Sequence, residues 1–411
     1  MWEIITIKKS FLFVLTFWFL TLGICHSDEK KTDCGMPFPF FLDNMREKAI
    51  KSGISSKTVS NVILNTEYLE EVIKLDRNQI AFRSSFTDFS NRSVNEYRLL
   101  HGQKKVEKYE SLFNEIWRNY GIPPEVIVSF WAMETDYGEV QGNFHTLSAL
   151  GTLANDCRRS ELFQGQYLSA MKLVENKMLN AKNSFGAWAG EFGQIQMLPS
   201  DIIAYGADGD GDGKVQLGIS SHDTILTAAK LILSKGWIPR QPWMQEVELR
   251  EDFPWQEAGL GRSRPIKDWL KLGVRLRKVG IYDFDSNTKA SLILPQGRKG
   301  PQFLIYPNFN VFMKWNNSFL YSTTAAYLAN RLGGESEFIS QDPEDILSFD
   351  QMIDLQEILY KMGYEVGKVD GILGAKTRQS VRIIQINLGL PADSWPTTEL
   401  LRLLKSIGVK G

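Results

Sequence analysis

The chain of 411 residues is long enough for two or three domains and carries 47 basic and 48 acidic side chains. This even balance argues against nucleic acid as a partner, because affinity for phosphate backbones depends on an excess of lysine and arginine. Aromatic residues make up 12% of the chain, which permits a carbohydrate site without requiring one, since aromatic rings stack on sugars as readily as they fill cores.

The first residues have the pattern of a secretory signal. Two lysines precede an apolar run at residues 11–24, and polar residues begin at His26. We expect cleavage after Ser27, which removes residues 1–27. The run is shorter than the ~20 residues of a membrane helix, so no stable membrane anchor is expected. An uncleaved anchor and a lipid attached to Cys25 are the alternatives.

Two cysteines, Cys34 and Cys157, remain once the signal is removed. Exported proteins meet an oxidising environment, in which an even number of cysteines is typical of disulfides. The sequence therefore predicts a bond between Cys34 and Cys157.

The N-terminal third of the mature chain is expected to be helical. Helical periodicity with polar faces runs through residues 36–120. Within it, Gly53 and Ser55 have the pattern of one helix end followed by the N-cap of the next helix.

The most informative helix is predicted at residues 122–138, with prolines suited to its first turn and Gly138 suited to its C-cap. Phe130, Trp131 and Glu134 recur at helical spacing on one apolar face. A carboxyl group on such a face is poorly hydrated, which disfavours its charge and raises its pKa, as suits a general acid. The alternative is a glutamate near a helix end that reaches solvent and has no catalytic role.

A glycine-rich segment follows at residues 186–200. Small residues there allow a ligand to approach the backbone closely, and the amides of Gln194 and Gln196 offer hydrogen bonds. A tight turn that leads into a helix is the alternative interpretation.

The second half of the chain changes character twice. Short β-like runs at residues 290–295 and 302–306 predict a small sheet, and helical periodicity returns at 308–332. Residues 333–348 contain two adjacent glycines, acidic side chains and a proline, which is a linker composition. This linker separates a compact tail from the rest.

Three separated segments have a recognisable order. They read Glu-Thr-Asp-Tyr-Gly at 134–138, Ala-Gly-Glu-Phe-Gly-Gln-Ile-Gln-Met-Leu-Pro-Ser at 189–200, and Asn-Phe-Asn-Val-Phe-Met-Lys-Trp-Asn-Asn-Ser-Phe-Leu-Tyr at 308–321. Together they resemble the lytic murein transglycosylases of the membrane-bound B type, a lysozyme-like superfamily. The resemblance covers residues 35–335. Each segment alone is a weak signal, but three in order at this spacing are a strong one.

The resemblance implies a cleft that cuts the glycan strand of peptidoglycan between N-acetylmuramic acid and N-acetylglucosamine without water. Glu134 matches the catalytic glutamate, which protonates the glycosidic oxygen and then takes the proton of the muramic C6 hydroxyl as that oxygen attacks C1. Because the sugar supplies its own nucleophile, the second carboxylate of ordinary glycosidases is not needed. Asp136 is expected to point away from Glu134, and Glu191 is the nearest rival acid.

Several residues match substrate-binding positions of the family. Gln196 matches a glutamine that contacts the sugar near the cleaved bond, and Gly193 and Gln194 belong to the same segment. Arg158 and Arg159 match a basic pair near the peptide stem. A solvated helix start is the alternative interpretation of the two arginines.

The third segment carries groups that the resemblance places near the acid. Asn316 and Tyr321 match an amide and a phenol, and Trp315 stands where the family usually has tyrosine. Ala187 is a departure, because the family often has serine there. The resemblance therefore implies that one hydrogen bond to the acetamido region is missing, with lower activity or compensation by another group as the alternatives.

Residues 208–214 read Asp-Gly-Asp-Gly-Asp-Gly-Lys, the opening of an EF-hand-like calcium loop. Asp208, Asp210 and Asp212 are the candidate ligands. The twelfth position is isoleucine, and Asp223 resembles the residue with which the family closes a similar loop. Such a calcium ion would be structural, since the implied reaction needs no cofactor. A metal-free turn is an equal alternative.

The tail combines helical periodicity at residues 355–364 and 381–390 with Asp-Gly-Ile-Leu-Gly-Ala-Lys-Thr at 370–377. It resembles a small three-helix peptidoglycan-binding module. The residues of the turn are suited to shaping it and capping a helix. We therefore assign binding to the module and to no single residue.

The predicted fold is mainly α. A signal peptide at 1–27 precedes a lysozyme-like α+β catalytic domain at 35–335, a linker at 336–348 and a small three-helix peptidoglycan-binding domain at 349–408. The expected protein is a periplasmic monomer whose partner is the glycan strand of peptidoglycan. Two alternatives remain: a hydrolytic muramidase, which needs a second carboxylate, and a non-catalytic wall-binding protein, which Ala187 slightly favours.

Overall fold

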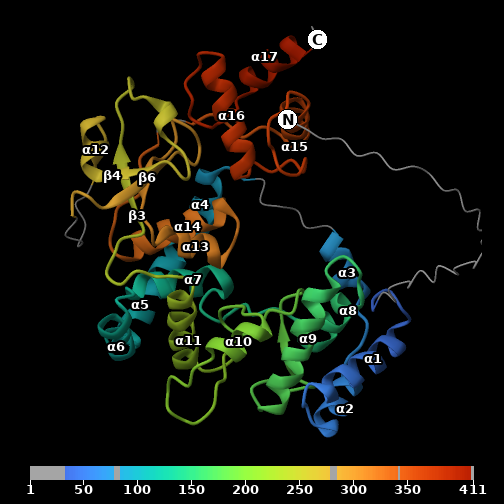
Figure 1. The fold of residues 1–411 in the computed structure, drawn as a ribbon. Coiled ribbons are helices and arrows are strands. Elements are labelled where there is room, and N and C mark those ends of the chain that lie inside the picture. The colour runs from blue at the N-terminus through green and yellow to red at the C-terminus, as the bar shows by residue number, and fades with distance from the viewer. Residues whose placement is uncertain (1–32, 78–83, 278–284, 341–342, 409–411) are drawn as a thin grey trace, which may run out of the picture.

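The structure is a computed structural model that describes residues 33–77, 84–277, 285–340 and 343–408. The predicted signal peptide lies outside these residues. Helices predominate in the described chain (Figure 1), which confirms the mainly α prediction.

The N-terminal third is helical, as predicted. Its helices are α1 (Phe38–Lys51), α2 (Ser56–Leu64), α3 (Glu70–Arg77), α4 (Phe86–Ser93), α5 (Glu96–Lys108) and α6 (Glu110–Tyr120). Gly53 takes a left-handed conformation after α1, and the Ser55 hydroxyl caps α2 by accepting the Thr58 N–H. The predicted helix boundary at these two residues is therefore confirmed.

The middle of the chain consists of helices and one small two-stranded sheet. The elements are α7 (Pro124–Thr135), β1 (Phe144–His145), α8 (Thr146–Asn155), α9 (Ser160–Glu175), β2 (Phe185–Gly186), α10 (Pro199–Tyr205) and α11 (Ser221–Ser234). Strands β1 and β2 pair antiparallel. A Cβ atom at Gly142 would lie 2.1 Å from the Gly186 carbonyl oxygen, so the close approach of these two segments requires glycine.

An antiparallel sheet with its own core follows. Its elements are β3 (Met244–Glu248), the 3-10 helix η1 (Trp255–Glu257), β4 (Ser263–Pro265), α12 (Ile266–Lys271), β5 (Arg275–Leu276), β6 (Lys289–Ile293) and β7 (Phe303–Ile305). The strand order is β4-β6-β7-β3-β5. Strands β6 and β7 confirm the two predicted β-like runs, and Trp269 at the centre of this core is fully buried.

The helical pattern predicted at residues 308–332 is interrupted. It forms α13 (Phe309–Trp315) and α14 (Phe319–Leu332), separated by a short turn. Asn316 has extended backbone after α13, and Ser318 caps α14 by accepting the Tyr321 N–H. The predicted helical pattern is confirmed, but the capping groups of this turn divide it into two helices.

Helix α7 is the central element of the largest core. It packs against α5, α11 and α14, and residues 126–132 are all buried. A helix that is apolar on every side is a core helix. It ends at Thr135, before the predicted Gly138, because Asp136 and Tyr137 already take left-handed backbone and the Asp136 carboxylate pairs with Arg98 Nε at 2.6 Å.

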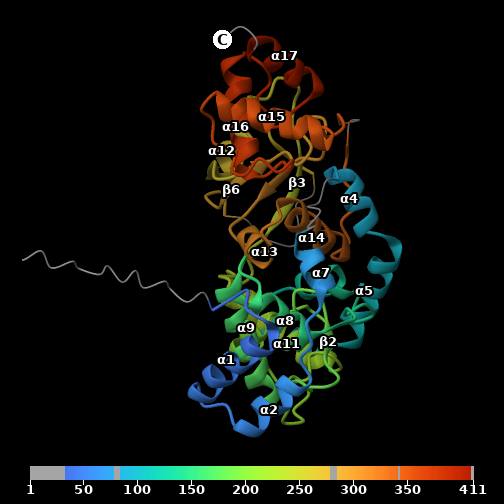
Figure 2. The same cartoon turned by 90° about the vertical axis from the view of Figure 1, so that its right-hand side faces the viewer.

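The C-terminal helices form a separate core that packs on the rest of the chain. They are α15 (Phe349–Lys361), α16 (Ala375–Asn387) and α17 (Thr398–Gly408). Figures 1 and 2 place them beside the sheet, at the end of the molecule opposite α1 and α2. The described part of the preceding segment lies against α14 and β3: the Phe338 ring contacts Tyr327, and the Ile339 N–H donates to Glu246.

Candidate active site

The carboxyl group of Glu134 lies where α7 meets the turn between α13 and α14. The indole N–H of Trp315 and the hydroxyl of Tyr321 both donate to its Oε1 atom, over 2.8 and 2.5 Å. Trp315 ends α13 and Tyr321 stands in the first turn of α14, so the break between these helices brings both donors to one oxygen. The Glu134 residue is half-buried and therefore accessible to a ligand.

The pKa of Glu134 is raised above its usual range. Burial is the main cause, and the negative charge of Glu191 adds to it. The hydrogen bonds from Tyr321 and Trp315 favour the charged form and oppose this shift. The net direction agrees with the prediction from the apolar helix face.

Aromatic rings pack behind Trp315, one of the two donors to the carboxyl group. The Phe130 ring stacks on Trp315 with centroids 4.1 Å apart and an interplanar angle of 13°, and it also contacts Phe312. Trp131 instead meets the Tyr137 ring edge to face. Both aromatic residues of the predicted apolar face are fully buried: Phe130 supports Trp315 from behind, and Trp131 packs in the core against Tyr137.

The glycine-rich segment is bonded directly to the end of α7. The Thr135 hydroxyl donates to the Gln194 carbonyl oxygen at 2.5 Å, and the Gln194 N–H donates to Leu217 at 2.9 Å. The Gln194 residue is only 5% exposed, and a Cβ atom at Gly138 would lie 2.7 Å from its Oε1 atom. Gln194 thus supports the end of α7 more than it faces solvent.

Gln196 is the more accessible of the two glutamines. It is half-buried, with a positive φ of 46°. Its amide nitrogen donates to the carbonyl oxygens of Gln141 and Gly193, over 3.0 and 2.9 Å. These bonds fix the orientation of the side chain. Gly193 itself is needed for its backbone, since a Cβ atom there would lie 2.8 Å from the Cβ of Leu217.

Asn316 shapes the turn that carries the donors to Glu134. Its Oδ1 atom accepts the Ser318 N–H at 2.9 Å, and its carbonyl oxygen accepts the Ser322 hydroxyl at 2.8 Å. The Asn316 residue is half-buried. The structure therefore brings Trp315 and Tyr321 to Glu134, and Asn316 lies in the turn between them.

Arg158 and Arg159 both bind the buried carboxylate of Asp76, in α3. Arg158 Nε lies 2.5 Å from Oδ2 and Arg159 Nη2 lies 2.5 Å from Oδ1. Burial opposes ionisation of Asp76, but the hydrogen bonds from Arg158 and Arg159 hold its pKa below the usual range. The arginine side chains remain 39% and 34% exposed, which leaves room for contact with a ligand.

Asp76 is a residue that the sequence did not point to. It lies 82 positions before Arg158, and a single acidic residue near a helix end is ordinary on a surface. No local pattern distinguishes it. No local sequence pattern indicates the stacking of Phe130 on Trp315 either.

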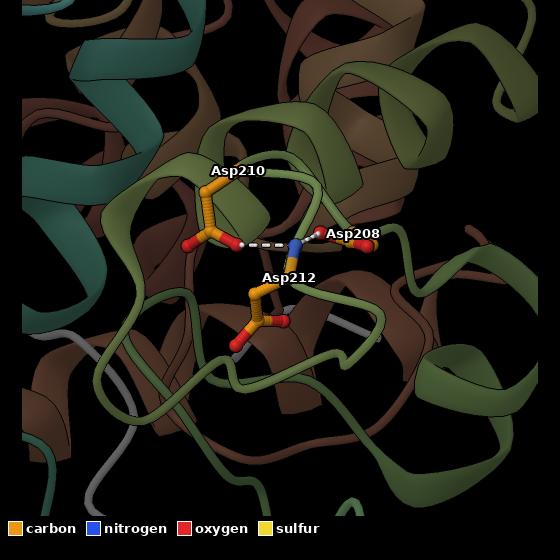
Figure 3. A group of neighbouring side chains, drawn as sticks. All are labelled: Asp208, Asp210 and Asp212. Atoms are coloured by element: carbon orange, nitrogen blue, oxygen red, sulfur yellow. Dashed lines mark hydrogen bonds between the residues drawn. The ribbon is translucent and has the colours of Figure 1, made fainter.

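The carboxylates of Asp208, Asp210 and Asp212 converge in one exposed loop (Figure 3). One oxygen from each lies within 4.8 Å of the other two. Backbone N–H groups, first that of Gly213 and then that of Gly211, lower the pKa of Asp208. Oxygen ligands of this kind suit calcium.

Asp223 lies outside this cluster and binds the backbone at both ends of the loop. It is 1% exposed, and its two carboxylate oxygens accept the N–H groups of Gly209 and Gln216, over 2.8 and 2.6 Å. These bonds tie the start and the end of the loop to α11.

The predicted disulfide between Cys34 and Cys157 is present, with Cα atoms 5.3 Å apart. It joins the segment before α1 to the loop that ends at Arg158. The Gly35 N–H donates to the Asn155 carbonyl oxygen beside it. The N-terminal segment is therefore fixed next to the arginine pair.

The geometry agrees with two sequence families. The model of the transglycosylase SLT domain matches residues 37–330, and that of the peptidoglycan binding domain matches residues 350–404. Since the first match covers most of the chain, the protein belongs to the lytic murein transglycosylase family. It is an enzyme of the lyase type that needs no cofactor for the reaction of its family.

Individual relatives support this family assignment. Membrane-bound lytic murein transglycosylase B of Escherichia coli (strain K12) is 28% identical over 293 residues, 69% of this chain and 78% of that protein. SltB3 from Pseudomonas aeruginosa, in crystal structures with NAG-anhNAM-pentapeptide and NAG-NAM-pentapeptide, is 33% identical, with a TM-score of 0.83 over 90% of this chain and 100% of its own. Escherichia coli Slt35 in complex with calcium, 24% identical with a TM-score of 0.61 over 71% of this chain and 92% of its own, shares the fold.

Within the part of the chain that the structure describes, no helix combines the length and the apolar character needed to cross a membrane.

Proposed function

We propose that this enzyme cleaves the β-1,4 bond between N-acetylmuramic acid and N-acetylglucosamine with Glu134 as its single acid and base. The reaction leaves 1,6-anhydro-N-acetylmuramic acid ends. The observation that supports it most directly is the convergence of Trp315 and Tyr321 on one oxygen of Glu134.

This convergence determines which oxygen of Glu134 carries the proton when burial keeps the group neutral. Among the described residues, both donors use Oε1 of Glu134, so the proton of the neutral carboxyl belongs on Oε2. From there it passes to the glycosidic oxygen as the bond to C1 breaks. The carboxylate that forms is stabilised by the same two hydrogen bonds and accepts the proton of the C6 hydroxyl as that oxygen bonds to C1.

Glu191 is the reason to weigh hydrolysis as a second candidate. It lies close enough to Glu134 for its charge to raise the pKa of that group. A nucleophile or a base for water must be ionised, whereas burial raises the pKa of Glu191. This environment favours the reaction with one carboxyl group.

Further roles are proposed from the resemblance of these residues to family positions. Gln196 and Asn316 are proposed to contact the sugars at the cleaved bond, with Gly193 and Gln194 supporting that surface. Arg158 and Arg159 are proposed to meet the carboxylates of the peptide stem with the exposed part of their guanidinium groups.

The remaining proposals concern location, partners and metal. We infer a periplasmic monomer, without a stable membrane anchor, made of a catalytic domain at residues 35–335 and a wall-binding domain at 349–408. The cluster of Asp208, Asp210 and Asp212 is proposed to hold a structural calcium ion, with Asp223 shaping the loop.

Mass analysis of the fragments released from purified sacculi tests the proposed reaction. Anhydro ends support it. Reducing ends would indicate a muramidase, and no release at all would indicate a wall-binding protein without activity.

A further inference from the structure

The C-terminal module inserts an arginine between itself and the catalytic part of the chain. Arg378, on α16, donates to the carbonyl oxygens of Leu294 and Pro295, over 3.4 and 2.7 Å. Its guanidinium also lies over two aromatic rings, 5.0 Å from the centroid of Phe319 and 5.5 Å from that of Trp395. Phe319 belongs to the catalytic part and Trp395 to the module.

This arginine is enclosed without an ion pair among the described residues. Burial lowers its pKa to about 10, although the charge of Asp393 opposes the shift. Its Nε atom is closed off from solvent and has no hydrogen-bond partner among the described residues. Enclosing a charge costs free energy that an apolar side chain would not, so simple adhesion between the two surfaces does not require an arginine here.

On the catalytic side of this contact, Phe319 is close in sequence to both residues that donate to Glu134. Phe319 is the first residue of α14 and lies in the short stretch between Trp315 and Tyr321, the two donors to Glu134. The two ends of this stretch, Trp315 and Tyr321, carry the donors. Between them, the stretch meets the module across a cavity of about 210 Å³, which Asn317 to Leu320 line together with residues 372–375.

A second arginine on the same helix offers a comparison. Arg382 also crosses the interface, donating to the Gln256 carbonyl oxygen at 3.2 Å, and burial lowers its pKa as well. Its bonded partner is in η1. Arg378 also docks beside the sheet, through its bonds to Leu294 and Pro295 after β6, but in addition it contacts Phe319 of α14. Comparing the two arginines therefore distinguishes docking of the module from contact with the active-site turn.

We propose that Arg378 is a positioning residue of the active site. By stacking on Phe319 it holds the start of α14, and thereby the hydrogen bonds that Trp315 and Tyr321 make to Glu134. The wall-binding module is then part of the catalytic machinery and more than a tethered anchor. The proposal rests on the role of Glu134 proposed above.

The test compares full-length variants on short soluble glycan fragments that carry peptide stems. Arg378→Met keeps side-chain length but removes the charge and the donors. We expect kcat to fall about tenfold, since small misplacements of reacting groups cost up to about 10²-fold, with KM changed much less. The descending limb of the pH–rate profile should also move to higher pH, because the bonds from Tyr321 and Trp315 lower the pKa of Glu134.

Arg382→Met is the matched control. It should weaken docking of the module, seen as a lower melting temperature, while the pH profile of the soluble reaction stays at its wild-type position. Arg378→Lys, which keeps the charge, should recover part of kcat. A profile shifted equally in Arg382→Met, or a wild-type profile and kcat in Arg378→Met, overturns the proposal.

A variant on the catalytic side guards against misfolding of the module. Phe319→Leu removes the ring beneath Arg378 and leaves the module intact, so it should reproduce the shift of the pH profile. Combining Phe319→Leu with Arg378→Met should shift the pH profile little more than either change alone, since both changes break the same contact. An unmoved profile in Phe319→Leu overturns the proposal. Loss of activity in Glu134→Gln is independent of these outcomes, so the two proposals fail separately.

Discussion

Trp315 donates its indole N–H to Glu134 over 2.8 Å, although the two residues are 181 positions apart. The bond aims a neutral donor at a carboxyl group whose pKa is raised by burial. It stabilises the carboxylate that forms once the proton has left, without adding a charge that would keep the acid ionised beforehand.

Replacing the acid tests its assignment. Glu134→Gln keeps the size of the side chain but cannot transfer the proton, so turnover should fall by about 10²–10⁴ or more. Release of anhydromuropeptides, followed by mass spectrometry, is the measurement. Binding to sacculi should persist. Glu191→Gln is the matched control and should be far milder; if it alone abolished release, the single-acid scheme would be wrong.

The pH dependence of the rate follows from the direction of the pKa shift. The enzyme needs protonated Glu134, so kcat should be highest at mildly acidic pH and fall as pH rises through the raised pKa. Tyr321→Phe removes a hydrogen bond that lowers this pKa, so the falling limb should move to higher pH while kcat drops. A limb that moved to lower pH would contradict the assignment.

Stability should change with pH in a related way. The folded pKa of Glu134 lies above the unfolded value, so the folded state binds more protons between the two. The contribution of Glu134 to the free energy of unfolding is therefore lost as pH rises from about 4 through the raised pKa. Glu134→Gln removes this penalty and should melt higher than wild type at neutral pH, with the difference shrinking towards acid. Parallel melting curves across pH would contradict burial as the cause.

The disulfide should be complete in the mature protein and important for its stability. Thiol titration after denaturation without reductant should detect no free thiol from Cys34 or Cys157. Because the bond closes a loop with a sequence separation of 123, its reduction should lower the free energy of unfolding by about 4–5 kcal/mol in the chain-entropy model. Urea melts with and without reductant measure this loss. Two titratable thiols would show that the bond does not form.

Calcium should raise the melting temperature, because an ion that binds only the folded state stabilises it. Asp210→Ala combined with Asp212→Ala should abolish this dependence, while the exposed control Asp252→Ala should retain it. Asp223→Asn should lower stability both with and without calcium, since its carboxylate accepts two backbone N–H groups. Equal wild-type melts in chelator and in millimolar calcium would show that the loop is a metal-free turn.

The arginine pair should act on affinity and not on chemistry. Arg159→Gln leaves Asp76 paired with Arg158 and should raise KM about tenfold for fragments with peptide stems, the size of one charge-assisted hydrogen bond. It should leave kcat and peptide-free glycans unaffected. Arg118→Gln, at an exposed site on α6, is the control. An equal effect on both substrates would place Arg159 in a purely structural role.

Features that depend on a few neighbouring residues could be predicted from the sequence. The cap at Ser55, the strands β6 and β7, the loop of three aspartates and the apolar surroundings of Glu134 all follow from local spacing, because capping and periodicity act within a turn or two of backbone. The disulfide also followed, since only one pair of cysteines remained after the predicted signal.

Only the tertiary structure decided the atoms through which distant residues meet. The family resemblance placed Trp315 and Tyr321 near Glu134, but the fold decided that both donate to the same oxygen. Arg158 and Arg159 bind Asp76, which has no sequence signature. Arg378 reaches Phe319 from another domain. These contacts depend on how separate elements pack around one core, and the free energy that selects them is shared among many buried residues, so no short stretch of sequence encodes them.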